Sequence, residues 1–281
     1  MMIGIIDVGG GTRDIYGAGV FDYCLEHHIA FDYGIGISAG SANLASFTAK
    51  QYKRNYHFFM DYAFREEYMS LKNFINKGSY VDLDYIYYTL SRKEGENPLD
   101  YETLKNNPMK FNVLAYNANT GEPHIFTKKD INQDEYQIFS ASSCLPIVCK
   151  PVNIEGVPYY DGGIIEPIPV RRALKDGCDK VVLILTRPKD YMRDSDHDKL
   201  NANILSKIDK KASEHLRKRA EVYNAALKDA WELEKQGKVL IVAPDTIGHM
   251  STLSKEKQNL YLLYRKGYND AEKIARFIRG E

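Results

Sequence analysis

Two short apolar runs near the beginning of the chain, each ended by a turn of small residues, restrict most strongly how this sequence can fold. Ile3–Val8 runs into the glycines Gly9–Gly11, and Phe31–Ile37 runs into Ser38. Apolar residues at helical spacing follow the first turn over Ile15–His28, and a segment of small residues that opens a helix follows the second. This order of strand, loop, helix, strand, loop and helix favours a parallel or mixed sheet with helices on its faces.

The rest of the chain carries further segments of both kinds, and 281 residues suffice for one large α/β domain with a helical extension. Strands are predicted at Phe111–Asn117 and His124–Thr127, joined as a hairpin, and at Val157–Tyr160, Lys180–Thr186 and Lys238–Ala243. Helices are predicted over Lys53–Arg92 with irregular breaks, over Leu200–Gln236 and over Lys255–Arg279. We therefore expect an α/β domain over residues 1–190 and a helix-strand-helix extension over residues 191–281, packed on the same domain.

Charge and cysteine content limit the partners and the compartment. Lys plus Arg and Asp plus Glu both number 38, so the chain lacks the basic excess typical of a protein that binds nucleic acid. Four cysteines without zinc-ligand spacing indicate free thiols in a reducing compartment; they are Cys24, Cys144, Cys149 and Cys178. The N-terminus lacks the basic region of a signal peptide, and no apolar run reaches the roughly 20 residues of a membrane span. We expect a cytoplasmic protein that needs no metal and no cofactor.

The segment Gly36-Ile37-Ser38-Ala39-Gly40 matches the pattern G-x-S-x-G between a predicted strand and a predicted helix. Acyl transfer uses this arrangement because the serine sits on a sharp turn with its hydroxyl exposed, and the glycines remove side chains that would clash there. The N-terminus of the following helix also favours developing negative charge. A plain turn of small residues is the alternative interpretation.

A second glycine-rich segment, Gly9-Gly10-Gly11-Thr12-Arg13, follows the first strand. Parallel pairing would bring it beside Ser38, where consecutive glycines allow backbone N–H groups to approach a developing oxyanion. A nucleotide-binding G-x-G-x-x-G pattern is excluded because Asp14 stands where its last glycine would be. A simple tight turn is again the alternative.

An aspartate that could serve as a base stands before two glycines in Asp161-Gly162-Gly163, after the predicted strand Val157–Tyr160. Taken alone, the segment also fits an Asx-turn. A conventional triad would need a histidine later in the chain. His197, His215 and His249 qualify by order, but their charged or helical surroundings favour surface positions.

Together and in this order, the three segments resemble the patatin-like phospholipase family, whose pattern is G-G-G-x-[KR], G-x-S-x-G and D-G-[GA]. A fourth segment, Ala141–Pro146, is similar to the Ala/Ser-rich helix and proline that precede the aspartate in that family. The resemblance spans about residues 3–190 and implies a three-layer sandwich with a mainly parallel sheet and a C-terminal helical extension.

The resemblance also implies functional roles. Ser38 would be the nucleophile and Asp161 its base, with Gly36 and Gly40 shaping the nucleophile turn. Gly9, Gly10, Gly11 and Arg13 would form the oxyanion hole. The activity implied is a phospholipase A or lysophospholipase type of ester hydrolysis through an acyl-serine intermediate.

One departure from the family pattern is Asp14, where the family usually has glycine, and it affects the expected shape of the loop end. A small-ester or thioester hydrolase and a catalytically silent lipid-binding protein are the rival interpretations. The expected partner is a phospholipid or other acyl ester, with transient contact at the inner membrane surface. The aromatic-rich stretch Tyr52–Tyr88 is a candidate acyl groove or lid, and the basic segment Lys207–Arg219 a candidate membrane contact or a solvated face.

Overall fold

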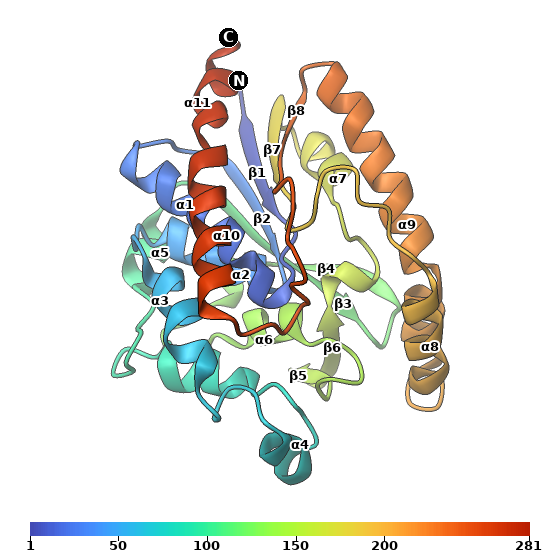
Figure 1. Cartoon of the computed structure of the whole chain (residues 1–281). Coiled ribbons are helices and arrows are strands. Elements are labelled where there is room, and N and C mark those ends of the chain that lie inside the picture. The colour runs from blue at the N-terminus through green and yellow to red at the C-terminus, as the bar shows by residue number, and fades with distance from the viewer.

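An eight-stranded sheet runs through the centre of the molecule (Figure 1). The computed structural model describes residues 1–281. The strands are β1 (Ile3–Asp7), β2 (Tyr33–Ile37), β3 (Lys110–Asn117), β4 (Glu122–Thr127), β5 (Val152–Ile154), β6 (Val157–Asp161), β7 (Lys180–Ile184) and β8 (Val239–Val242). Their order is β5-β6-β3-β2-β1-β7-β8, and β4 also pairs with β3. Strands β3, β2, β1, β7 and β8 run parallel to one another, whereas β4, β5 and β6 run antiparallel to their neighbours. The prediction of a mainly parallel sheet is therefore confirmed.

Helices cover both faces of this sheet. On one side lie α1, α2 and α10, and on the other lie α7 and α9 (Figure 1). The α-helices are α1 (Ile15–Glu26), α2 (Ala39–Thr48), α3 (Arg54–Met60), α4 (Leu71–Lys77), α5 (Tyr101–Asn106), α6 (Gln137–Ser143), α7 (Val170–Lys175), α8 (Asp196–Leu205), α9 (Lys210–Lys235), α10 (Lys257–Asp270) and α11 (Glu272–Arg279). Short helical turns are η1 (Gly11–Asp14), η2 (Tyr62–Phe64), η3 (Tyr85–Leu90, a π-helix), η4 (Lys128–Asp130) and η5 (Gly162–Ile164). No helix combines the length and apolar character that crossing a bilayer requires.

The buried strand β7 shows how one sheet serves two hydrophobic cores. Val182 and Ile184 belong to a cluster of 53 buried residues that includes α1 and α10. Val181 and Leu183 point the other way, into a cluster of 17 buried residues shared with α7 and α9. Side chains alternate along a strand, so a central strand with apolar residues on both faces has a layer of helices on each side. The predicted three-layer α/β fold is therefore confirmed.

Two segments were each predicted as a single helix, and this prediction was wrong for both. The segment predicted over Leu200–Gln236 contains two helices, α8 and α9. The side chain of Asp209 accepts a hydrogen bond from the Ala212 N–H (2.9 Å) and starts the second. The segment predicted over Lys255–Arg279 likewise divides into α10 and α11. The division of the chain at residue 190 stays a prediction, and β8 lies in the same sheet as β1.

Helix α10 packs directly on the backbone of α1. A Cβ added to Gly267 would lie 2.0 Å from the Tyr16 carbonyl oxygen, and one added to Gly19 would lie 2.2 Å from that of Tyr264. Buried hydroxyls reinforce the contact, since Tyr264 donates to Asp22 and Tyr16 to Asp270, both at 2.8 Å. Helix α10, near the end of the chain, is therefore part of the same packed body as α1.

This close packing predicts that Gly267→Ala destabilises the fold. Because the new Cβ meets a carbonyl oxygen, the helices must separate, and overpacking of this kind costs about 1–3 kcal/mol. The melting temperature should fall by about 2–4 °C for each kcal/mol. Gln258→Ala, an exposed position on the same helix, is the control and should leave it unchanged. Equal melting temperatures for the two variants would contradict this account of the contact.

Candidate active site

The register of the sheet brings the three sequence motifs to one place. Residue Ile37, at the end of β2, pairs with Leu114 of β3, and Asp161, at the end of β6, pairs with the next residue, Ala115. Ala115 also pairs with β4 on its other side, so β6 lies on the same side of β3 as β2 does. Since β2 runs parallel and β6 antiparallel to β3, their carboxyl ends meet. The residue that follows Ile37 is Ser38, so the two strand ends bring Ser38 and Asp161 together.

Ser38 occupies a strained turn between β2 and α2. Its φ is 55° and its ψ is −134°, which is rare for a residue with a side chain. The Ser38 N–H donates to the Ser142 hydroxyl (2.9 Å), and its carbonyl accepts from the Ser41 hydroxyl (2.6 Å). Such strain persists only where the surroundings fix the conformation, and these bonds do so.

The glycines on either side of Ser38 permit close backbone contacts. A Cβ at Gly36 would lie 2.4 Å from the Cα of Ser41, and a Cβ at Gly40 would lie 2.4 Å from the carbonyl oxygen of Asp7. Both contacts are far shorter than any real Cβ makes, so each position requires glycine.

The glycine-rich loop follows β1 and lies beside Ser38. Gly9, Gly10 and Gly11 all have positive φ angles, of 71°, 145° and 62°. The Gly9 N–H donates to Asp7 Oδ1 (3.1 Å), whereas the Gly10 N–H donates to no group of the protein. A Cβ on Gly9 would lie 2.9 Å from the Cβ of Ser38, which places this backbone against the serine.

Arg13 lies behind this loop. Its guanidinium donates from Nη1 to the Thr252 hydroxyl (3.0 Å), while its Nε is buried without a partner. Burial, followed by the charge of Arg187, lowers the pKa of Arg13 to about 10. The Arg13 side chain does not line the cavity that contains Ser38.

Asp161 is buried at the end of β6, and η5 follows it. Its Oδ1 accepts a hydrogen bond from the Gly163 N–H (2.8 Å). Burial raises the pKa of Asp161 above its ordinary value, while the charge of Arg219, a hydrogen bond from the Ser38 side chain and the Gly163 amide act to lower it. The carboxyl group is thus a stronger base than an exposed aspartate, and the strand ends place it beside Ser38.

Asp14, the departure from the family pattern, forms a buried acid pair with Asp7. A Cβ at Gly17 would lie 2.5 Å from a carboxyl oxygen of each aspartate, and neither Asp14 oxygen has a donor within the protein. The Asn43 amide donates to Asp7 Oδ2 (3.1 Å) and to the Asp14 carbonyl (2.9 Å). Burial raises the pKa of both aspartates, and the charge of Asp7 raises that of Asp14 further. The pair therefore favours a state that keeps a proton on the two carboxyl groups.

An apolar cavity opens beside Ser38. Of the 27 residues that line it, 18 are hydrophobic, so it suits an acyl chain better than a polar substrate. The aromatic-rich stretch contributes Phe58, Phe59 and Tyr68, whereas Phe74 is 51% exposed and points outward. The π-helical turn η3 adds further apolar side chains to the wall.

The structure separates the remaining sequence candidates. None of His197, His215 and His249 lines the cavity that contains Ser38. All four cysteines are free, as predicted, and all four are buried. In the basic segment Lys207–Arg219, most cationic side chains are exposed. The exception is Arg219, which turns inward and donates from Nε to the Gly163 carbonyl (2.8 Å).

Two residues at the site, Arg219 and Thr252, were not singled out by sequence as parts of it. Each lies far along the chain from the motif that it contacts. No local pattern marks them, because only the tertiary fold creates the contact.

Comparison with known proteins identifies the family. Residues 8–174, more than half of the chain, match the family model described as patatin-like phospholipase. The chain therefore belongs to the patatin-like phospholipase family. Residues 209–278 match a second model, described only as a domain of unknown function (DUF6363).

Two individual proteins are similar to the chain. It is 30% identical over 191 residues to the uncharacterized protein YjjU of Escherichia coli (strain K12), over 66% of this chain and 52% of that protein. The chain thus spans about half the length of this curated relative. Among solved structures, VipD from Legionella pneumophila is similar with a TM-score of 0.47 and 12% identity, over 97% of this chain and 66% of that chain.

The buried acid pair predicts a pH-dependent stability that Asp14→Asn should reduce. The folded protein keeps protons that the unfolded chain releases above about pH 4, so stability falls as the pH rises through the pair's raised pKa values. Each unit of raised pKa corresponds to about 1.4 kcal/mol. Removing one acid should make the melting temperature decline less between about pH 5 and pH 8.

The matched control is Asp190→Asn, which removes an exposed aspartate. Its melting curve should follow the wild type at every pH. If Asp14→Asn also declined in parallel with the wild type, the two buried carboxyl groups would not keep a proton.

Proposed function

We propose that the protein is a lipid acyl hydrolase in which Ser38 and Asp161 form a catalytic dyad. The observation that carries this proposal is the meeting of β2 and β6 on β3, which brings the aspartate beside a serine that lines an apolar cavity. Membership of the patatin-like phospholipase family supports a lipid ester as the substrate. The reaction is the cleavage of a carboxylic ester of the phospholipase A or lysophospholipase type.

The first half of the reaction forms an acyl-enzyme. The Ser38 Oγ attacks the ester carbonyl carbon while Asp161 accepts the hydroxyl proton. The negative charge passes to the carbonyl oxygen, toward the N–H groups of Gly10 and Gly11, the two amides that we assign to the oxyanion hole. When the tetrahedral intermediate collapses, the carbon–oxygen bond to the alcohol breaks, and the alcohol leaves with the proton from Asp161.

The second half releases the fatty acid. Asp161 accepts a proton from water, whose oxygen attacks the acyl-serine carbonyl, and Ser38 leaves with the proton that Asp161 returns. In this scheme Gly9 and Arg13 support the loop rather than donate to substrate. The Gly9 N–H is already bonded to Asp7, and the Arg13 guanidinium already donates to the Thr252 hydroxyl.

A fluorescent fluorophosphonate tests the dyad. Labelling of the wild type should be abolished by Ser38→Ala, which removes the nucleophile. It should be at least about 100-fold slower in Asp161→Asn, which removes the general base. Ser206→Ala, at the end of α8, is the control and should label at the wild-type rate.

The possible results distinguish the rival functions. Rapid labelling of Asp161→Asn would place the base elsewhere and refute the dyad. Failure of a folded wild type to label would favour a lipid-binding protein without catalysis. A labelled enzyme that prefers short esters or thioesters over long-chain lipids would indicate the small-ester alternative.

We further propose that helix α4 contacts a lipid surface. Leu71, Phe74 and Ile75 of this helix are 73%, 51% and 80% exposed, respectively. Their spacing i, i+3, i+4 places the three side chains on one face of the helix. The helix extends from the body of the molecule (Figure 1). Lys72 is exposed on the same helix, and a cation beside an apolar face favours a position at a lipid surface.

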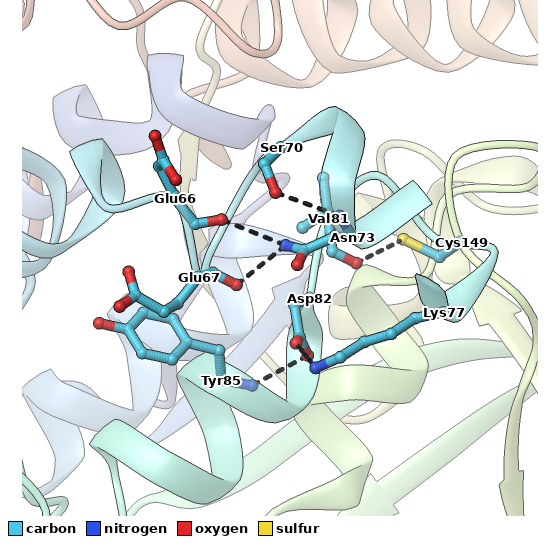
Figure 2. A network of polar contacts seen from close by, with 9 residues as sticks. All are labelled: Glu66, Glu67, Ser70, Asn73, Lys77, Val81, Asp82, Tyr85 and Cys149. Atoms are coloured by element: carbon cyan, nitrogen blue, oxygen red, sulfur yellow. Dashed lines mark hydrogen bonds and ion pairs between the residues drawn. The ribbon is translucent and has the colours of Figure 1, made fainter. Parts of the chain in front are cut away.

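A polar network anchors α4 to the neighbouring segments (Figure 2). The buried Asn73 side chain donates to the carbonyls of Glu66 (3.4 Å) and Glu67 (3.0 Å), and Lys77 forms an ion pair with Asp82. The segments on either side of α4 contribute Tyr68, Val81 and Leu83 to the cavity wall. Lipid contact by α4 would therefore bring the cavity close to its substrate.

A vesicle-binding experiment tests this surface. The variant Leu71→Ser/Phe74→Ser/Ile75→Ser should bind vesicles of phosphatidylcholine and phosphatidylglycerol at least about tenfold more weakly, since each fully buried apolar side chain contributes about 1.5–3 kcal/mol. Its hydrolysis of a soluble short-chain ester should be unchanged. The matched control, Leu200→Ser/Ile204→Ser/Ile208→Ser, alters three other exposed apolar residues. Equal binding of vesicles by both variants would refute lipid contact by α4. A dimeric wild type that becomes monomeric in the α4 variant would also refute it, because the apolar face would then join two copies of the chain.

A further inference from the structure

The part of the chain that matches a domain of unknown function contacts both loops beside Ser38. Residues 209–278 lie outside the segment that matches the patatin-like family. They include α9 and α10, which cover opposite faces of the sheet (Figure 1). One residue from α9, Arg219, and one from the segment before α10, Thr252, reach the site.

Thr252 fixes the glycine-rich loop by backbone and side chain together. Its carbonyl oxygen accepts hydrogen bonds from the N–H (2.8 Å) and the hydroxyl (3.2 Å) of Thr12. Its own hydroxyl accepts from Arg13 Nη1 (3.0 Å). A Cβ on Gly11 would lie 2.1 Å from the Thr252 carbonyl oxygen, so the two backbones touch. Thr252 and Leu253 also line the cavity that contains Ser38.

Arg219 braces the turn that carries Asp161. Its Nε donates to the Gly163 carbonyl (2.8 Å), two residues after the aspartate. A Cβ on Gly163 would lie 3.2 Å from Arg219 Nη2, so this end of the guanidinium also lies against the turn. Among the charges near Asp161, that of Arg219 has the largest effect on its carboxyl group and favours the ionised form.

We propose that the C-terminal region, residues 209–278, completes the active site, with Thr252 and Arg219 as positioning residues that hold the glycine-rich loop and the Asp161 turn. The inference rests on the proposed hydrolase function and assigns a role to a segment that the family model does not cover. Neither residue touches the reacting atoms. Each acts through the loop that it holds.

The surroundings of Arg219 and Asp161 define what a substitution would change. The groups that face Asp161 are Ser38, Arg219, Tyr87 and Cys144, and the only cation among them is Arg219. The charged or titratable groups that face Arg219 are Arg193, Asp161, Asp198 and Tyr223. Of these, Arg193 and Asp198 already pair with each other through two bonds of 2.6 Å. Removal of the Arg219 charge therefore affects mainly Asp161 and raises the pKa of the Asp161 carboxyl group.

The first experiment measures hydrolysis of a soluble short-chain ester as a function of pH. In Arg219→Gln, kcat should fall about 10–100-fold with little change in KM, because a displaced base slows the chemical step more than binding. The acid limb of the profile should move to higher pH, since a base with a raised pKa is protonated at higher pH. Arg219→Lys keeps the charge and should restore the acid limb. The control is Arg217→Gln, an exposed arginine on the same helix that donates to Asn203.

The second experiment measures hydrogen exchange and needs no activity. Thr252→Val removes the acceptor for Arg13, so the amides of residues 9–14 should exchange faster. Arg219→Met should accelerate exchange in residues 161–165 in the same way. Thr246→Val, the same substitution at an exposed threonine of the same connecting segment, is the control.

The results separate this inference from the proposed function. A wild type that neither labels nor hydrolyses esters refutes the hydrolase alone, because exchange still reports whether the C-terminal region holds the two loops. Unchanged exchange in both Thr252→Val and Arg219→Met overturns the positioning role. In an active enzyme, a wild-type kcat and acid limb in Arg219→Gln also overturns it.

Discussion

The change of partner along β3 is the constraint on which the candidate site depends. This strand pairs with β2 as far as Leu114 and with β6 from Ala115 onward. A parallel and an antiparallel neighbour therefore end head to head on the same side of one strand. Backbone hydrogen bonds of the sheet fix that meeting point, so the side chains of Ser38 and Asp161 come together without depending on flexible loops.

Close approach of backbones is the second requirement, and glycine supplies it at particular positions. The loop after β1 reaches Ser38 only because Gly9 can lie against it with a positive φ. The same is true where α2 crosses the end of β1 at Gly40 and where α10 crosses α1 at Gly267.

Buried charge gives the site its chemical character. Burial favours the neutral form of Asp161, and the nearby guanidinium of Arg219 opposes that tendency. Beneath the glycine-rich loop, the carboxyl groups of Asp7 and Asp14 both lie against Gly17, and Asp7 also accepts a hydrogen bond from the Gly9 amide. The loop that we assign to the oxyanion hole therefore rests on an acid pair whose ionisation would cost stability.

The sequence by itself determined the features that depend on near neighbours in the chain. The apolar runs and their glycine turns predicted the parallel sheet, and the spacing around Ser38 predicted the turn between strand and helix. The order of three motifs predicted the family. Tertiary structure alone decided which distant residues meet: Thr252 with Arg13, and Arg219 with Gly163. Such contacts have no local signature, because they arise from the packing of whole helices and strands rather than from the conformational preference of any segment.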